Sequence, residues 1–364
     1  MPGQSVTLRS FFGVANRSHA NITDRFVHMI YTDMLPISTV EHEGFKGLIS
    51  LLAPGYIIPT RKTVVALLEG HFEETKTKPM TLLASDKVQG VSLTCDLWTS
   101  IANDGYIGIT SHFISEDWKL CSVSIGVEEM DERHTGENIA ESLKTVTQEW
   151  KIAEKVRCIV RDNAANMAKA CRLLQDQFGW DHEGCVGHTL QLSVTAGLES
   201  ATISNLLAKA RKLVGHFSHS LRATAELHKV QKRNKRLERN LLQDVSTRWN
   251  SSHLMLGCLV QEKLSINTVL EDEATTSAQD RDRLRLSGGQ WDLAEELVEA
   301  LEPLQVATTA LSEESNTSIS AVYTMIVWLL EHMDPKSHAT DSQAISAFRK
   351  RVAADLAQRF PLLQ

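Results

Sequence analysis

Two aspartates inside apolar segments are the residues of this sequence best suited to chemistry. Asp96 lies within VSLTCDLWTS (91–100), and Asp162 ends VRCIVRD (156–162). Asp is depleted in strands and costly to bury without a partner. Because converging carboxylates are the ligands that Mg²⁺ prefers in phosphoryl-transfer sites, the pair indicates a Mg²⁺ site. In the alternative interpretation, Asp162 caps a helix that starts at Asn163, and Asp96 pairs with an Arg or with the backbone.

A second group of metal-competent side chains lies in HEGCVGH, at 182–188. His182, Cys185 and His188 are three residues apart and could each bind zinc. No CxxC or HxxxH pair completes a ligand set, so the spacing favours a buried polar motif. Zinc is therefore not expected as a cofactor.

The segment 209–240 is strongly basic in a chain whose formal net charge is −7. It carries ten Lys and Arg against two Glu, a local net charge of +8. Such a segment can follow a phosphate backbone, and its KRNKR run at 232–236 is compatible with nuclear import. The alternative is a solvated helix face. Downstream, Trp249 beside Arg248 could stack on a displaced base, or could simply anchor the helix that follows.

The hydrophobic pattern predicts a mixed α/β scaffold for these residues. Alternating apolar residues and tight-turn signals predict three strands in an antiparallel meander, followed by a helix, a buried strand, a second helix and a short strand. The predicted ranges, in that order, are 91–100, 105–115, 118–127, 135–150, 156–162, 163–177 and 184–188. This order is typical of a mixed sheet packed against helices.

Helical periodicity dominates both flanks of that scaffold. Residues 1–20 are polar and predicted to be disordered, and helices are predicted within 22–52 and over 63–72. After Thr189 only helical patterns occur, over 189–213, 219–241, 250–270, 291–313, 319–333 and 342–360. The acidic stretch 271–282 is predicted to be a loop.

Composition excludes several classes of protein. Hydrophobic residues make up 42% and charged residues 23%, which is incompatible with disorder throughout. No apolar stretch approaches the ~20 residues of a membrane span, and the N-terminus lacks the apolar core of a signal peptide. The six cysteines are scattered without a CxxC pair, so a disulfide framework is not expected.

Four motifs, in this order and spacing, resemble one known family. TCDLWTS (94–100), VRDNAANM (160–167), CVGHTLQLSV (185–194) and DVSTRWNSSHLML (244–256) are similar to the hAT superfamily of DNA transposases. The nearest group is the domesticated BED-finger (ZBED-type) proteins. Segments 35–64 and 301–320 extend the resemblance over about residues 20–360.

The resemblance implies an α/β fold with an RNase H-like core, interrupted by a large all-helical insertion and preceded by a small helical N-terminal domain. The implied domains are a disordered segment 1–20, a helical DNA-binding-like segment 21–80, a βββαβαβ core 88–200 without its closing helix, and a helical insertion 201–364.

The resemblance also assigns roles to single residues. The family's first two catalytic carboxylates fall on Asp96 and Asp162, and Cys185 and His188 match a CxxH motif with a structural role. The DNA-binding candidates, taken from the family pattern and from the basic run, are Trp98, Arg248, Trp249, Lys232, Arg233, Lys235 and Arg236.

Two departures from the family pattern qualify the expected function. The family's third acid, a Glu in a C-terminal ERxFS-like motif, has no counterpart, and no CxxC…HxxxH set of a BED finger precedes residue 80. Asp96 and Asp162 are therefore expected to be vestigial, with Mg²⁺ binding left open and DNA cleavage not expected.

The leading hypothesis is a transposase-derived, catalytically inactive nuclear protein that binds DNA or chromatin partners and regulates transcription. One alternative is a remnant Mg²⁺-dependent transposase or nuclease. Another is a protein-interaction scaffold, including the SUMO-ligase role attributed to a BED-type relative. The family dimerises mainly through a C-terminal region that has no counterpart in this sequence. A monomer or weak dimer is therefore expected.

Overall fold

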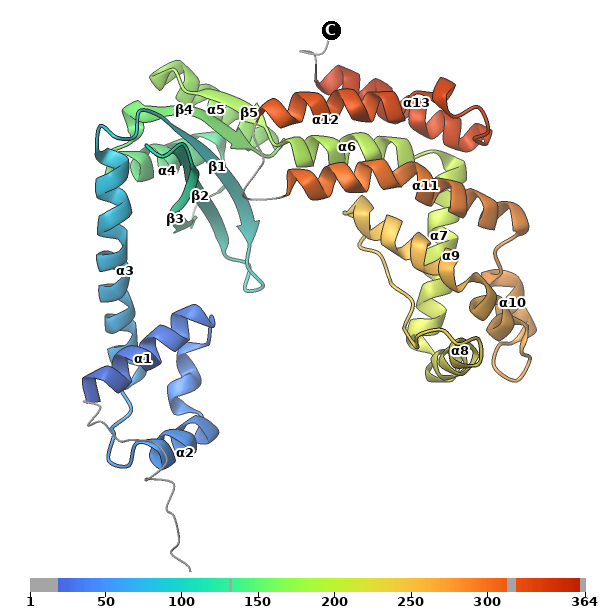
Figure 1. Ribbon diagram of the computed structural model, residues 1–364, viewed down its shortest axis with the longest axis horizontal. Helices are drawn as coiled ribbons and strands as arrows, with labels where there is room; N and C mark the ends of the chain where they lie inside the picture. The colour runs from blue at the N-terminus through green and yellow to red at the C-terminus, as the bar shows by residue number, and fades with distance from the viewer. Residues whose placement is uncertain (1–18, 131–132, 313–318, 361–364) are drawn as a thin grey trace, which may run out of the picture.

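A computed structural model describes residues 19–130, 133–312 and 319–360 of the chain (Figure 1). The disorder predicted for 1–20 falls outside these residues, except that His19 and Ala20 begin the first helix. The described residues form three hydrophobic clusters: in the N-terminal helices, around a central sheet, and in the C-terminal helices. None of the helices in the described ranges is long and apolar enough to span a membrane.

The N-terminal unit is small and helical. Its elements are α1 (His19–Thr32), the 3₁₀ turn η2 (Ile37–Glu41), α2 (Glu43–Leu52) and α3 (Arg61–Ala84). Its core consists of Phe26, Val27, Ile30, Val40 and Val64.

Helix α3 is much longer than the predicted segment 63–72, because its second half packs on the sheet domain. Leu83 is fully buried in the sheet's cluster, and Lys76 Nζ lies 2.5 Å from Glu149 Oε1. The Lys76 ammonium also lies over two aromatic rings, 5.6 Å from the Phe72 centroid and 5.7 Å from the Trp150 centroid. In Figure 1, α3 separates the N-terminal helices from the sheet.

The five strands form one mixed sheet. They are β1 (Val91–Thr99), β2 (Gly105–Ile114), β3 (Leu120–Glu129), β4 (Val156–Arg161) and β5 (Asp181–Gly184). Their order is β3-β2-β1-β4-β5, with β1, β2 and β3 antiparallel and β4 parallel to both β1 and β5. The predicted meander and mixed α/β class are confirmed.

Two helices cover one face of this sheet, α4 (Gly136–Glu149) and α5 (Ala165–Phe178), with the 3₁₀ turn η3 (Ala153–Lys155) between them. Inward residues of the strands, such as Leu93 and Ile107, are buried with Ile139 and Leu143 of α4. The last strand differs from the predicted range 184–188. Polar DHEG forms β5, while the apolar residues that suggested a strand begin the next helix.

The C-terminal half of the described chain is helical. Its elements are α6 (Val186–Leu198), α7 (Ala201–His219), α8 (Leu221–Arg233), α9 (Trp249–Glu271), α10 (Ala278–Leu284), α11 (Gly288–Leu311), α12 (Ile319–His332), η4 (Pro335–Ser337) and α13 (Gln343–Arg359). Leu190 and Val194 of α6 belong to this helical core. The change from sheet core to helical core therefore falls at the start of α6 and not at residue 200.

Three helical boundaries differ from those predicted. The single helix expected over 189–213 is two helices that meet at 199–200 and, in Figure 1, run in different directions. The helix expected over 219–241 ends at Arg233. Part of the loop expected over 271–282 is α10, whose first turn is capped by the Ser277 hydroxyl accepting from the Asp280 N–H.

Candidate functional site

The two predicted aspartates lie on or just after two neighbouring inner strands of the sheet, β1 and β4. β1 and β4 are parallel, with Thr94 opposite Val160. Continuing that register by two residues would set Asp96, inside β1, opposite Asp162, the residue that follows the end of β4. Since side chains alternate across a strand, the Asp96 carboxylate stands on the face opposite the one covered by α4 and α5.

Each carboxylate keeps one oxygen available. Asp96 Oδ1 accepts from the Leu97 N–H at 3.0 Å, and Asp162 Oδ1 accepts from the Ala164 N–H at 3.0 Å. Within the described ranges, no hydrogen bond engages the second oxygen of either group. The Asp162 carboxylate thus accepts from the backbone just before α5, as the capping interpretation predicts. Its second oxygen is still available for the predicted Mg²⁺ site.

The residues around the pair do not complete a metal cluster. Among the described residues, no group of three or more His, Cys, Asp or Glu side chains is arranged to hold a metal ion. Two carboxylates still suit a Mg²⁺ ion, which keeps several water ligands and takes others from phosphate. The neighbouring Cys95 does not add a ligand, because burial strongly raises the pKa of its thiol and keeps it protonated.

An aromatic pair stands beside Asp96 on the same face of the sheet. Trp98 is 42% exposed and stacks on Tyr106, with ring centroids 5.7 Å apart and ring planes inclined by 19°. Its indole lies directly over Gly108, where a Cβ would come within 2.8 Å of the ring. Glycine is thus required at this position for the indole to lie flat against β2. The exposed ring face suits stacking against a base.

The CxxH motif lies at the junction of β5 and α6. The Cys185 N–H donates to the Arg161 carbonyl at 2.6 Å, and the Cys185 carbonyl accepts from the Thr189 N–H and hydroxyl. The Asn163 amide donates to the Thr189 hydroxyl at 3.1 Å, which ties the end of β4 to α6. His188 is exposed in the first turn of α6. The motif is built from backbone contacts, in agreement with a structural role for Cys185.

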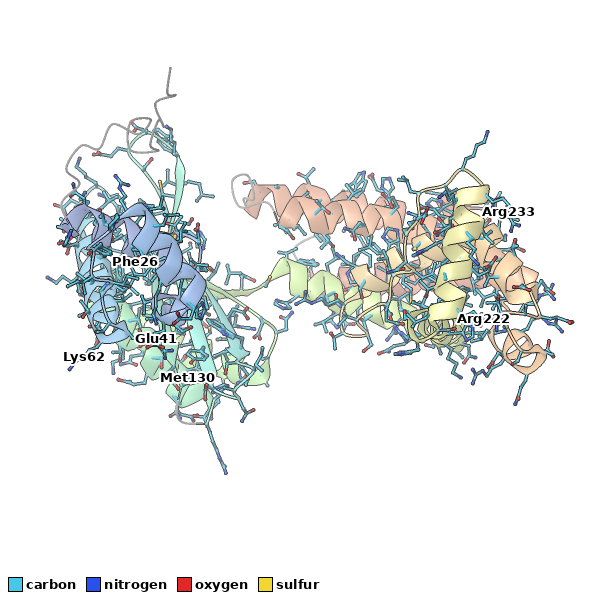
Figure 2. All side chains as sticks on the ribbon, turned by 90° about the horizontal axis from the view of Figure 1, so that it is seen from below. Phe26, Glu41, Lys62, Met130, Arg222 and Arg233 are labelled. Carbon is cyan, nitrogen blue, oxygen red and sulfur yellow. The ribbon has the colours of Figure 1, made fainter. Side chains whose placement is uncertain are left out.

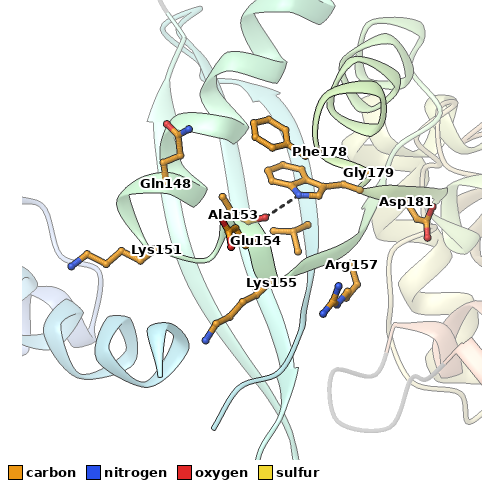
Figure 3. Close-up of a pocket in the computed structure, with 11 residues that line it drawn as sticks. Gln148, Lys151, Ala153, Glu154, Lys155, Arg157, Phe178, Gly179 and Asp181 are labelled. Atoms are coloured by element: carbon orange, nitrogen blue, oxygen red, sulfur yellow. Dashed lines mark hydrogen bonds between the residues drawn. The ribbon is translucent and has the colours of Figure 1, made fainter. Parts of the chain in front are cut away.

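A cleft of about 830 Å³ lies at the opposite end of the parallel strands (Figure 3). It is lined by residues that precede β4 and β5, including Lys151, Lys155 and Trp180. Trp180 Nε1 donates to the Ala153 carbonyl at 3.0 Å, and Lys155 Nζ donates to the Leu83 and Ser85 carbonyls. These side chains hold η3 and α3 in place, so the cleft is separate from the aspartate edge.

Buried acids neutralise a large part of the basic segment. Asp244, whose side chain is 1% exposed, accepts two hydrogen bonds from Arg211 Nε and one of 2.8 Å from Nη2. Glu262, whose side chain is 2% exposed, pairs with Arg239 at 2.9 Å and with Arg236 at 3.8 Å. The Arg236 guanidinium also donates to the Gln261 carbonyl. Arg236 is therefore tied to α9 although its side chain is 43% exposed, and its role in DNA binding stays a prediction.

Five other cations of the segment are exposed without an ion pair in the described part of the chain: Lys212, Arg222, Lys232, Arg233 and Lys235. Lys232 and Arg233 lie in the last turn of α8, and Lys235 follows with a positive φ of 57°. Figure 2 shows Arg222 and Arg233 at the two ends of α8, on the surface of the helical half. The helix end and the turn after it thus present a small, uncompensated positive surface, here called the α8 basic end (Lys232, Arg233 and Lys235).

The Arg248–Trp249 pair is divided between surface and core. Arg248 is the exposed residue that precedes α9, whereas Trp249 is 3% exposed and belongs to the helical core. Its ring centroid lies 6.5 Å from that of His253, one turn along the same helix. Burial therefore gives Trp249 the anchoring role of the alternative interpretation, and the predicted base-stacking role does not agree with this position.

The most important residues missed by the sequence reasoning are Asp244 and Glu262. Nothing local distinguishes them, since their partners lie 33 and 23 residues away along the chain. One signal was present: Asp244 begins the DVSTRWNSS motif, in which Ser252 also donates to its carboxylate at 2.7 Å. An acid in an otherwise basic segment is the kind of residue that suggests a buried partner for Arg.

Comparison with known protein families gives two adjoining matches. The model of the ZBED1 RNase-like domain matches residues 94–187, and that of the ZBED1 RNase-like helical domain matches residues 184–300. The first covers most of the sheet with both aspartates, and the second covers α6 to the middle of α11. Their meeting point agrees with the change of hydrophobic core at the start of α6.

Several curated proteins are similar over most of this chain. The chain is 25% identical, over 85% of its length, to a Talaromyces stipitatus protein named provisionally as the transcriptional regulator tpeD. It is 26% identical over 84% to the human zinc finger BED domain-containing protein 4. It is 28% identical over 79% to a Zea mays protein that its name assigns provisionally to the AC transposases. These matches cover 40%, 26% and 36% of the relatives' own lengths.

Proposed function

Because this chain is a ZBED-like protein derived from an hAT transposase, we propose that it binds DNA through exposed cations of its helical half and does not cleave it. The observation that carries this proposal is the α8 basic end. Buried acids neutralise other cations of the same segment, but Lys232, Arg233 and Lys235 lack an ion pair among the described residues. Cations that neutralise phosphates release counterions and so supply affinity for DNA.

The aromatic pair supports the same proposal from the sheet domain. Trp98 presents a partly exposed ring on an uncovered sheet face, next to two carboxylates. Stacking on an aromatic ring contributes about 1–3 kcal/mol per base and tolerates any sequence. DNA held at the α8 basic end and at Trp98 would be bound by backbone charge and stacking, and Arg248 would add a further phosphate contact.

Neutralising the α8 basic end is expected to weaken DNA binding and its dependence on salt. The slope of log K against log salt should fall by about 2 to 3 in the Lys232→Gln, Arg233→Gln, Lys235→Gln triple variant, because each lost phosphate contact removes about 0.9. The measurement is fluorescence anisotropy of a labelled duplex over a salt series. A matched control removes three exposed cations elsewhere that also form no ion pair with a described residue, Lys119→Gln, Lys336→Gln and Lys350→Gln. Equal slopes for the two triple variants would contradict the proposal.

The proposal that the chain does not cleave DNA depends on the carboxylate pair. Asp96 and Asp162 could together hold one Mg²⁺, whose chemistry would be to neutralise charge on a bound phosphate. A two-metal site needs further acidic ligands, and the described residues supply no third carboxylate beside the pair. Their adjacency favours a second candidate function, a remnant metal-dependent nuclease, over complete loss of the site.

A nicking assay separates these two functions. Supercoiled plasmid incubated with the chain and Mg²⁺ or Mn²⁺ is expected to stay intact, because two carboxylates cannot hold both metals of a hydrolytic site. The informative control is Asp96→Asn, which keeps the shape of the side chain and removes its charge. Nicking by the unaltered chain that disappears in Asp96→Asn would establish the nuclease and overturn the proposed inactivity.

We extend the proposal to a nuclear protein that acts in transcription. The name of the Talaromyces stipitatus relative supports this role, as does the basic run 232–236, which is compatible with nuclear import. A fluorescent fusion of the chain should accumulate in nuclei, and the triple variant of the α8 basic end should not. The chain is expected to be monomeric or weakly dimeric in light scattering.

A further inference from the structure

A cleft of about 430 Å³ lies where α7, α8 and α10 meet. Lys212, His216 and His219 line it from α7, and Arg283 lines it from α10. The α7 residues are four and three positions apart, a spacing that places side chains in a row on one face of a helix. The cleft is therefore lined on one side by a row of nitrogen-bearing side chains and on the other by a guanidinium.

The charge of this cleft is largely uncompensated. Lys212 and His219 are exposed and form no ion pair with any described residue. Arg283 pairs with Asp280 at 2.8 Å, and the Ser277 hydroxyl donates to the other oxygen of that carboxylate. Asp280 is thus engaged on α10, where it offsets Arg283 and also acts on the His216 ring. Lys212 remains as a positive charge in the cleft without an ion pair among the described residues.

The start of α8 adds to the attraction for an anion. Ser220 lines the cleft and caps α8, its hydroxyl accepting from the Ala223 N–H. The first turn of a helix carries a partial positive charge from its free N–H groups. Arg222, exposed in that turn, is placed on the surface at this end of α8 in Figure 2.

His216 supplies a neutral donor or acceptor. Burial lowers the pKa of its imidazole, so the ring is uncharged near neutral pH. Its Nε2 atom is buried and has no hydrogen-bond partner among the described residues. A buried ring nitrogen of this kind is normally satisfied by a partner. A small shift of the ring toward an oxygen-rich ligand in the cleft would provide one.

We propose that this cleft holds a phosphate group of a nucleic-acid backbone. The ligand class follows from the cations Lys212 and Arg283 and two imidazoles, which together line a space large enough for a tetrahedral oxyanion. The polymer follows from α8. Its 13 residues span about 20 Å, and the cleft lies at one end with the α8 basic end at the other. That span corresponds to roughly six base steps along one strand.

This inference rests on the proposed DNA binding and adds a second contact point to it. A duplex lying along α8 would place phosphates in the cleft and at Lys232 and Arg233 together. The two sets of cations would then contribute independently, since they share no ion pair. A free phosphate would occupy the cleft alone and would be indifferent to the α8 basic end.

The test follows the ring signals of His216 and His219 by NMR in the full chain, during separate titrations with inorganic phosphate and with a duplex. Both ligands should shift both rings. In Lys212→Gln/Arg283→Gln, the shifts should disappear and duplex affinity should fall roughly tenfold, as expected for loss of charge-assisted contacts. The control Lys350→Gln/Arg351→Gln removes equal charge from exposed positions on α13 and should match the unaltered chain.

The outcomes separate the cleft from the proposed function. Ring shifts with phosphate but not with duplex would overturn the nucleic-acid assignment. Duplex binding that depends on the α8 basic end but leaves both rings unshifted would overturn this inference and leave the proposed function standing. Equal duplex affinity for the two double variants would also overturn the inference.

Discussion

Asp244→Ala is expected to destabilise the chain by about 2–3 kcal/mol, because it removes a buried carboxylate that accepts several charge-assisted hydrogen bonds. The carboxylate is 1% exposed and accepts from Arg211, Ser252 and Gln243. Its loss would leave the partly exposed Arg211 guanidinium without its carboxylate partner and release the segment 234–248 from α7. Urea unfolding followed by far-UV circular dichroism measures the loss.

The matched control is Glu238→Ala, which removes an acid of the same segment from an exposed position. It should change the free energy of unfolding by no more than about 0.5 kcal/mol. Similar midpoints for Asp244→Ala and the unaltered chain would show that the segment is held by other contacts. The basic segment would then not depend on buried acids for its shape.

The same carboxylate predicts how stability depends on pH. Burial by itself would raise the pKa of Asp244, but the hydrogen bonds from Arg211 and Ser252 outweigh burial and lower the pKa. The pair therefore contributes stability that is present above the ordinary Asp pKa and is lost as pH falls through the lower folded value. In Asp244→Asn, this part of the acid destabilisation should be absent.

Gly197→Ala is expected to destabilise the chain by about 1–3 kcal/mol, through overpacking where α6 crosses α13. A Cβ at this position would lie 2.6 Å from Val352 Cγ2 and 2.8 Å from two ring carbons of Phe348. Both neighbours are fully buried, so neither can move away without disturbing the helical core. The measurement is the free energy of unfolding in urea, with the slope checked for two-state behaviour.

Gly257→Ala is the control for that variant. Gly257 lies inside α9 with open space around its Cα, so an added methyl group meets nothing within 4 Å. Because Ala is a better helix former than Gly, this variant should gain roughly 0.5–1 kcal/mol. Opposite signs for the two substitutions are the expected result. A gain in both would mean that α6 and α13 are not closely packed in solution.

The carboxylate pair shows how far local patterns reach. The apolar runs around Asp96 and Asp162 identify two strands, and alternation along each strand determines which side chains share a face. Local patterns do not determine how the two strands pair. Their parallel pairing in the structure places Asp96 and Asp162 on or just after neighbouring strands. The prediction of a possible metal site thus began with the sequence, but its geometry depends on strand order.

In the basic segment, local sequence patterns do not predict which cations form ion pairs. The ten Lys and Arg residues within 209–240 all carry one positive charge. No periodicity in the sequence indicates that Arg236 forms an ion pair and Lys235 does not. The buried acids Asp244 and Glu262 pair with Arg211, Arg236 and Arg239. The cations left without an ion pair among the described residues include Lys232, Arg233 and Lys235 of the α8 basic end. Which cations remain free is decided by partners far along the chain.

Periodicity and short motifs were enough to predict the mixed α/β class, the strand meander, the helical character of both flanks and the resemblance to ZBED-type proteins. The burial of Trp249, the end of α8 at Arg233 and the cleft shared by Lys212 and Arg283 could not be predicted in this way. Burial, ion pairs and clefts form between segments that are distant in sequence. The type of a single residue does not indicate which distant residues will contact it.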